Sequence, residues 1–196
     1  MSYGVVRTDL MYATDVRSGL VSIKYMGADG ETPTAIENGN VLKVGALMEG
    51  EREIHVGSAV AANDKMSDIV LIATPEVMYD ERKRNLDEYI NDVDRICRGY
   101  RLHVGDVFSV TKDALAGVSE PAVGDVVELA AGTKLNVATS ATNGSTAIGE
   151  ILAVDVVGRY TYYAIIVKEP VTASAGSGAG GESGGGAGGE SGNGAG

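Results

Sequence analysis

Short segments in which apolar and polar residues alternate cover most of the chain, and turn-forming residues separate them. In residues 20–26, Val21, Ile23 and Tyr25 fall on one side, and Ser22 and Lys24 fall on the other. A period of two is typical of a β-strand with one buried face. Similar segments lie at residues 41–48, 53–60, 107–110, 126–129, 134–139, 147–156 and 160–167. The pattern predicts a mainly β protein, built as a small antiparallel β-barrel or sandwich.

One segment is apolar without alternation. Residues 69–73 read Ile-Val-Leu-Ile-Ala, and Pro75 follows them. The run is too short for a typical helix and is rich in β-branched residues, so we expect it to be the most buried strand.

A four-residue sequence occurs twice in the second half of the chain. Val-Gly-Asp-Val stands at residues 104–107 and again at 123–126, each time directly before an apolar segment. Gly permits a positive φ, and Asp can hydrogen-bond the local backbone, so each copy predicts a turn that leads into a strand. The repetition indicates two strands that begin at similar corners.

Residues 79–98 differ from the rest because they are highly charged. Their apolar residues fall at helical spacing, which predicts an amphipathic helix that ends before Gly99. The alternative is an ordered loop held by ion pairs between adjacent acidic and basic residues. Either form presents a charged surface. The simpler interpretation is a face in contact with water, and the alternative is an interface between subunits. The candidate interface residues are Arg82, Lys83, Arg84, Asp87, Glu88, Arg95 and Arg98.

The two ends of the chain differ from its middle. We expect an N-terminal arm at residues 1–19, a β-rich domain at 20–170 with the 79–98 insertion, and a low-complexity tail at 171–196. The tail consists mostly of Gly, Ser and Ala, and residues 178–184 recur unchanged at 186–192. Such a composition predicts a flexible coil in isolation.

The composition of the chain reduces the number of molecule classes that are expected to bind it. The formal net charge of −11 disfavours duplex nucleic acid and anionic membranes as partners. No apolar run reaches about 18 residues, so no membrane-spanning helix is expected. The start of the chain lacks a basic and apolar leader, so no signal peptide is expected. A single cysteine, Cys97, excludes an intrachain disulfide and a cysteine-rich zinc site.

Residues that commonly carry catalysis are few. The two histidines, His55 and His103, fall in predicted strands, and we interpret them as ordinary strand residues rather than metal ligands. Cys97 is interpreted as a small buried hydrophobic residue rather than a nucleophile. The chain has no G-x-S-x-G elbow, Walker sequence or dinucleotide glycine pattern. We therefore expect a protein that is not an enzyme and uses no cofactor or metal.

Three stretches together resemble a known class of protein. They are residues 73–82, residues 98–110, and the closing strands with their Gly-Asp, Gly-x-x-Leu and Ile-Gly-Glu-Ile sequences. Across about residues 20–168 the chain resembles virion structural proteins of tailed bacteriophages, of the capsid decoration or head cement type.

The resemblance implies a role and a set of partners. Proteins of this type bind the outside of an assembled capsid, commonly as trimers, and join neighbouring copies of the major capsid protein. The implied location is therefore the capsid surface of the virion, after synthesis in the host cytoplasm. Two alternatives stay open at this point. One is a tail-tube or fibre-base protein of the virion, and the other is a carbohydrate-binding or hydrolytic domain, which would need a pocket with converging polar groups.

Overall fold

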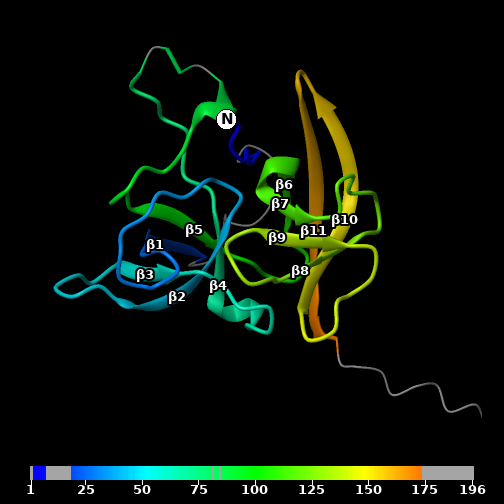
Figure 1. Ribbon diagram of the computed structural model, residues 1–196, viewed down its shortest axis with the longest axis horizontal. Helices are drawn as coiled ribbons and strands as arrows, with labels where there is room; N and C mark the ends of the chain where they lie inside the picture. Colours follow the sequence, from blue (N-terminus) through cyan, green and yellow to red (C-terminus); the bar gives the residue numbers. More distant parts are fainter. Residues whose placement is uncertain (1, 8–18, 81, 84, 174–196) are drawn as a thin grey trace, which may run out of the picture.

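Two β-structures lie side by side in the chain. The computed structural model describes residues 2–7, 19–80, 82–83 and 85–173. Figure 1 shows a closed barrel built from the first half of the chain, and beside it a sheet in which one long hairpin stands almost upright. The predicted mainly β architecture of barrel or sandwich type is confirmed.

The barrel has five short strands, which follow one another around it in the order β1-β3-β2-β4-β5. β5 pairs with β1 and closes the barrel, and every pair is antiparallel except β1 with β3. The strands are β1 (Leu20–Tyr25), β2 (Val41–Leu47), β3 (Ile54–Ser58), β4 (Ile69–Ile72) and β5 (Cys97–Arg101).

The second sheet has six strands in the order β6-β11-β10-β8-β9-β7. Among the described strand pairs of this sheet, only β7 with β9 is parallel. Its strands are β6 (Val107–Thr111), β7 (Leu115–Gly117), β8 (Val126–Glu128), β9 (Leu135–Ala138), β10 (Thr146–Val157) and β11 (Tyr160–Thr172). Single turns of 3₁₀ helix lie in the connections, namely η2 (Met66–Asp68), η3 (Leu86–Glu88) and η4 (Lys112–Ala114).

Strand β4 is apolar on both faces because it separates two cores. Ile69 and Leu71 pack into the core between barrel and sheet, together with Phe108. Val70 and Ile72 point the other way, into the core inside the barrel. All four β4 side chains are fully buried, which confirms the prediction of a most buried strand. Alternation along a strand places successive side chains on opposite faces, so a strand covered on both sides needs a continuous apolar sequence.

The barrel interior is narrow, and a glycine makes room for its core. A Cβ atom on Gly57 would lie 2.9 Å from side-chain carbons of both Ile23 and Leu42. That separation is shorter than ordinary carbon–carbon contact, so a larger residue would displace these two buried side chains. The absence of a side chain at Gly57 therefore lets the strands approach.

The repeated Val-Gly-Asp-Val sequence forms the same corner twice. Gly105 and Gly124 have φ values of 93° and 92°, which glycine adopts at little cost. Each following carboxylate accepts a 2.8 Å hydrogen bond from the N–H three residues earlier, Asp106 from His103 and Asp125 from Ala122. The corners lead into β6 and β8 as predicted.

The described residues of 79–98 form a loop followed by the start of β5, and they do not form the predicted amphipathic helix. Among these described residues only η3 is helical, and Cys97 and Arg98 already belong to β5. Long-range backbone pairing determines this outcome: Asn91 and Ile36 exchange N–H···O bonds of 2.9 and 3.0 Å. A helix would have to give up this bridge to the barrel.

Residues 2–7 lie along the edge of β6, where Val6 forms an isolated antiparallel β-bridge with Val110. The Val5 carbonyl accepts from the Thr111 N–H, and the Arg7 N–H donates to the Ser109 carbonyl. Val5 and Val6 are buried by this contact. Residues 8–18 of the predicted arm and residues 174–196 of the predicted tail lie outside the described residues. Strand β11 continues through Pro170 to Thr172.

Candidate interaction surface

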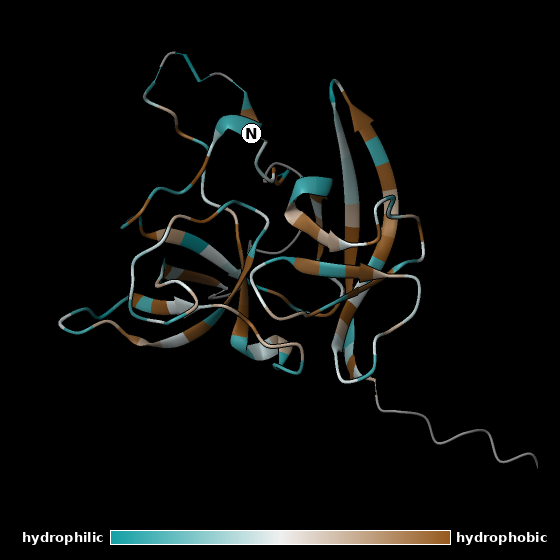
Figure 2. Cartoon of the chain, viewed as in Figure 1, coloured by the Kyte–Doolittle hydropathy of each residue, from teal (hydrophilic) through white to brown (hydrophobic). Residues whose placement is uncertain are grey.

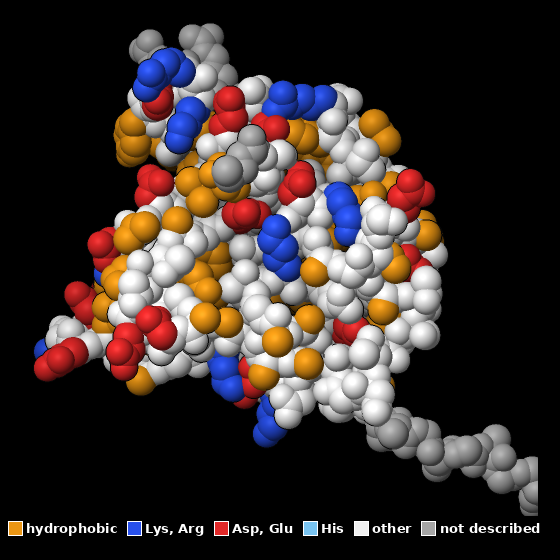
Figure 3. Space-filling model, viewed as in Figure 1, with side chains coloured by type: hydrophobic (Ala, Val, Ile, Leu, Met, Phe, Trp, Pro, Cys, Tyr) orange, Lys and Arg blue, Asp and Glu red, His pale blue; other side chains and the backbone are white. Residues whose placement is uncertain are grey.

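The connection between β4 and β5 exposes apolar side chains although its backbone is ordered by tertiary contacts. This connection, residues 75–96, is called the β4–β5 loop below. Tyr79 is 90% exposed, and Val77, Val93 and Ile96 are about half exposed. Figure 3 shows hydrophobic side chains beside charged ones at the upper left, where Figure 1 places this loop. These exposed apolar side chains make the loop a candidate contact site.

Buried amides attach the β4–β5 loop to the barrel. The Asn38 side chain donates to the Thr74 carbonyl at 2.8 Å and accepts from the Thr74 N–H at 3.0 Å. The Asn91 side chain donates to Asn38 and to the Ile36 carbonyl, both at 3.0 Å. Asn38 and Asn91 are nearly inaccessible to water, so these bonds satisfy polar groups that water does not reach. These bonds join the chain to the barrel at Thr74 and at Asn91.

The predicted interface residues divide between this loop and the barrel. Arg82 donates to the Asp80 carboxylate at 2.9 and 3.0 Å, and Lys83 lines a small pocket in the loop. Glu88 accepts from the Asn85 N–H, and Arg95 stacks over the Tyr89 ring. Arg98 lies apart from them on β5, and Arg84 is outside the described residues.

Asp87 joins three separate parts of the chain. Its carboxylate accepts from the Arg159 guanidinium and from the Tyr160 hydroxyl at the tip of the β10–β11 hairpin. Its carbonyl accepts from the Tyr3 N–H of the arm. The sequence singled out Asp87 as an interface residue, but the tip residues that hold it were not predicted. Their only signal was the Gly-Arg turn at 158–159.

One ion pair lies within the loop itself, between Arg82 and Asp80. The two hydrogen bonds from the Arg82 side chain, together with the Arg82 N–H, lower the pKa of the Asp80 carboxyl. Both partners are accessible to water, so the pair contributes little to folding stability. Exposed charges of this kind contribute more to the choice of binding partner, because they attract surfaces of opposite charge and repel surfaces of like charge.

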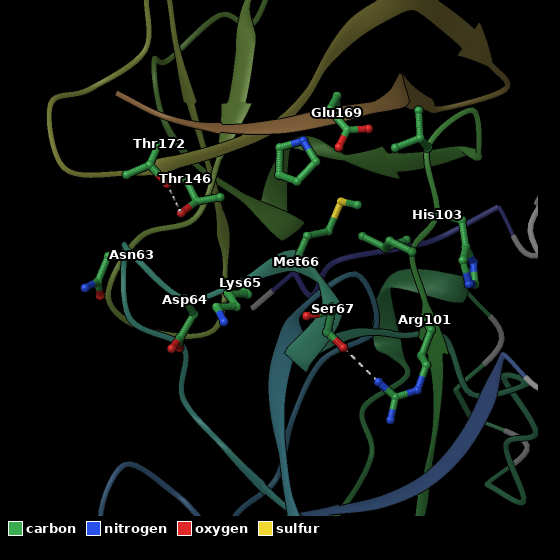
Figure 4. Close-up of a pocket in the computed structure, with 13 residues that line it drawn as sticks. Asn63, Asp64, Lys65, Met66, Ser67, Arg101, His103, Thr146, Glu169 and Thr172 are labelled. Carbon is green, nitrogen blue, oxygen red and sulfur yellow. Dashed lines mark hydrogen bonds between the residues drawn. The ribbon is translucent and has the colours of Figure 1, made fainter. Parts of the chain in front are cut away.

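A second concave feature lies between the barrel and the sheet. This groove has a volume of about 870 Å³, with Met66, Leu102 and Pro170 among its apolar lining residues. Figure 4 shows the charged side chains spread around it, with Glu169 on the sheet side and Arg101 on the barrel side. Arg101 donates to the Ser67 carbonyl at 2.8 Å. The charged side chains of the groove do not converge on one point.

One ion pair at the end of the groove has perturbed pKa values. Burial alone would raise the pKa of the Asp64 carboxyl, but the Ala61 N–H and the Lys43 ammonium outweigh that effect and lower it. The same contact raises the pKa of Lys43. Because the folded state favours ionised Asp64, its contribution to stability is complete above the unfolded pKa of about 3.9. It is lost as the pH falls through the lower, folded-state pKa.

We expect the variant Asp64→Asn to be less stable than the original chain by about 1 kcal/mol at pH 7, because charge-assisted hydrogen bonds are lost. The difference should shrink as the pH is lowered from 5 to 2, since the original carboxyl is then protonated. Urea unfolding at several pH values measures this. Glu51→Gln removes an exposed charge from the β2–β3 turn and serves as the control. A pH-independent difference for Asp64→Asn would contradict the prediction.

The other candidate groups are Cys97 and the two histidines, of which His55 lies on β3 as predicted, whereas His103 lies in the connection after β5 and not in a strand. Burial raises the pKa of the Cys97 thiol to about 11, so the thiol stays protonated at neutral pH, in agreement with its interpretation as a buried hydrophobic residue. His55 Nδ1 lies 2.9 Å from the Gly45 carbonyl oxygen, and His103 lies beside Asp106. Within the described part of the chain, no group of three or more His, Cys, Asp or Glu side chains is arranged to hold a metal ion.

Comparisons of the chain with protein-family models, with curated proteins and with solved structures found no match. Among the residues that the structure describes, no helix has the length and apolar character needed to cross a membrane.

Proposed function

We propose that this chain is a non-enzymatic structural protein of a tailed-bacteriophage virion, one that binds the outer capsid surface and bridges neighbouring copies of the major capsid protein. The observation that carries the proposal is the β4–β5 loop, which exposes Tyr79 and several half-exposed aliphatic residues and is joined to the barrel by buried amides at Thr74 and Asn91. Attachment at these two points limits the conformational entropy that the loop loses on binding, which suits a protein that functions through contact.

The arm gives the proposal further support. Residues 5–7 already bond the edge of β6 through their backbone, and proteins also use pairing at a sheet edge between chains. A cement protein acts in many copies on one shell, so modest single contacts add up through multivalency. The resemblance to decoration proteins points to the head of the virion.

The proposal is tested by co-sedimentation with mature and immature shells of the phage and by mixing with its free capsid monomer. We expect the protein to pellet with assembled shells and to show little binding to monomer. Tyr79→Ser should weaken shell binding by about tenfold or more, since exposed aromatic residues often dominate interfaces. Leu47→Ser, at a half-exposed position on β2, is the matched control.

Two results would contradict the proposal. Equal binding to shells and to free monomer would exclude a protein that recognises the assembled lattice. Labelling confined to the tail of intact particles would move the chain to the tail-tube or fibre-base class.

A further inference from the structure

The outer half of β10 has one side that no described segment covers. Strand β8 pairs with residues 147–150 of β10, and the corner at Gly124 and Asp125 bonds Ile151. From Leu152 to Val157, β10 pairs with β11 alone among the described strands. Figure 1 shows this part of the hairpin rising beyond β8, and Figure 2 shows apolar colouring that continues to its end.

The backbone of Val154 and Val156 faces this open side. Val167 on β11 bonds Gly105 and Asp106 and therefore faces away from β10. Residues at even steps along a regular strand face the same way, so Tyr163 and Thr161 also face away from β10. Their partners across the ladder are Val154 and Val156. In an antiparallel pair, opposite residues both face each other or both face away, so these two valines direct N–H and C=O groups outward.

The side chains around this edge favour contact. Val154 is 40% exposed and Val156 is 74% exposed, and alternation places both on one face of the hairpin. Natural edge strands are usually protected from pairing by Lys, Pro or a covering segment. Residues 153–157 contain neither Lys nor Pro, and Asp155 is their one charged residue.

Asp155 determines which strand the edge can accept. A two-fold antiparallel pairing with a second copy, centred on Asp155, would use the outward groups of Val154 and Val156 and would place the two Asp155 residues directly opposite each other. In such a non-hydrogen-bonded pair the Cα atoms are only about 4.5 Å apart. Like charges directly opposite are destabilising, so the aspartate opposes self-pairing in this register at neutral pH.

We propose that the open edge from Val154 to Val156 accepts an antiparallel strand of another protein, with Lys or Arg opposite Asp155 and β-branched apolar residues opposite the two valines. The pairing then gains main-chain hydrogen bonds, apolar contact and a cross-strand ion pair. The net charge of −11 further favours a basic partner strand. This inference is independent of the capsid proposal, because any protein with such a strand fits the edge.

Titration of the ¹⁵N-labelled protein with short peptides tests the inference. The probes are acetyl-Thr-Val-Lys-Val-Thr-amide and the same peptide with Glu in place of Lys. We expect the Lys peptide to shift the amide resonances of Val154 and Val156, and the Glu peptide to bind about tenfold more weakly. Asp155→Lys should invert this preference. Glu51→Lys, which changes an exposed charge by the same amount elsewhere, should leave it unchanged.

A second variant tests the role of Asp155 in preventing self-pairing. Asp155→Asn should abolish the discrimination between the peptides and raise the mass measured by light scattering, whereas Glu51→Gln should not. The inference is overturned if the peptide shifts fall outside β10, or if Asp155→Lys leaves the preference unchanged. It is also overturned if the Val154 and Val156 amides are protected from hydrogen exchange before peptide is added, because the edge would then already be paired.

Discussion

Replacing Asn38 with alanine is expected to lower the free energy of unfolding by about 3 kcal/mol, because several buried polar groups then lose their partner. The Asn38 side chain bonds both the N–H and the carbonyl of Thr74 and also receives the Asn91 amide. The barrel and the start of the β4–β5 loop are joined at this point. The substitution should therefore loosen the proposed contact surface as well as the fold.

Urea unfolding with linear extrapolation measures the loss of stability, and hydrogen exchange reports whether residues 75–96 open first. Asn63→Ala is the matched control, since Asn63 is exposed. Surface substitutions of that kind usually change stability by no more than about 0.5 kcal/mol. A loss below about 1 kcal/mol for Asn38→Ala would mean that water replaces the missing amide and that the network does not anchor the loop.

Replacing Phe108 with alanine is expected to cost about 4 kcal/mol, the largest effect that we predict. Phe108 is the only phenylalanine in the chain and is completely buried in the core that Ile69 and Leu71 of the barrel share with the sheet. Removing the ring leaves a cavity between the two halves of the molecule. Because both halves line that cavity, both should be destabilised together.

Thermal unfolding followed by circular dichroism checks this expectation. For a domain of this size, about 4 kcal/mol corresponds to a decrease in Tm of roughly 10 °C. Phe108→Leu keeps most of the apolar volume and should cost about 1–2 kcal/mol. If the sheet melts early while the barrel keeps its original transition, the two halves do not depend on this shared core.

The local pattern of residues 69–73 predicted their structure, whereas the helical spacing of residues 79–98 did not, and this difference has a physical cause. The apolar run at 69–73 was interpreted as the most buried strand, and β4 confirms it, because a strand covered on both faces must be apolar throughout. In residues 79–98 the helical spacing was real, but Asn91 pairs with Ile36 of the barrel and keeps the segment extended. Helical spacing in a single segment carries no information about such a distant partner.

The prediction of the candidate surfaces was limited in the same way, because it used only local sequence patterns. The sequence indicated that the charged residues of the 79–98 segment form a surface, and Asp87 does join the arm and the hairpin tip there. It placed Arg98 in the same group, although Arg98 belongs to a barrel strand. The open edge of β10 was not predicted, because an edge is defined by the strands that do not pair with it.

The sequence alone determined the strand-forming segments, the two Gly-Asp corners, the buried state of Cys97 and the mainly β class, because these depend on alternation, turn chemistry and burial preference within a few residues. Only the tertiary structure decided that the strands divide into a barrel and a sheet with a shared core, that Asn38 anchors the β4–β5 loop, and that no described strand other than β11 pairs with the outer half of β10. These features arise from hydrogen bonds and contacts between residues far apart in the chain, and local sequence patterns do not specify such pairings.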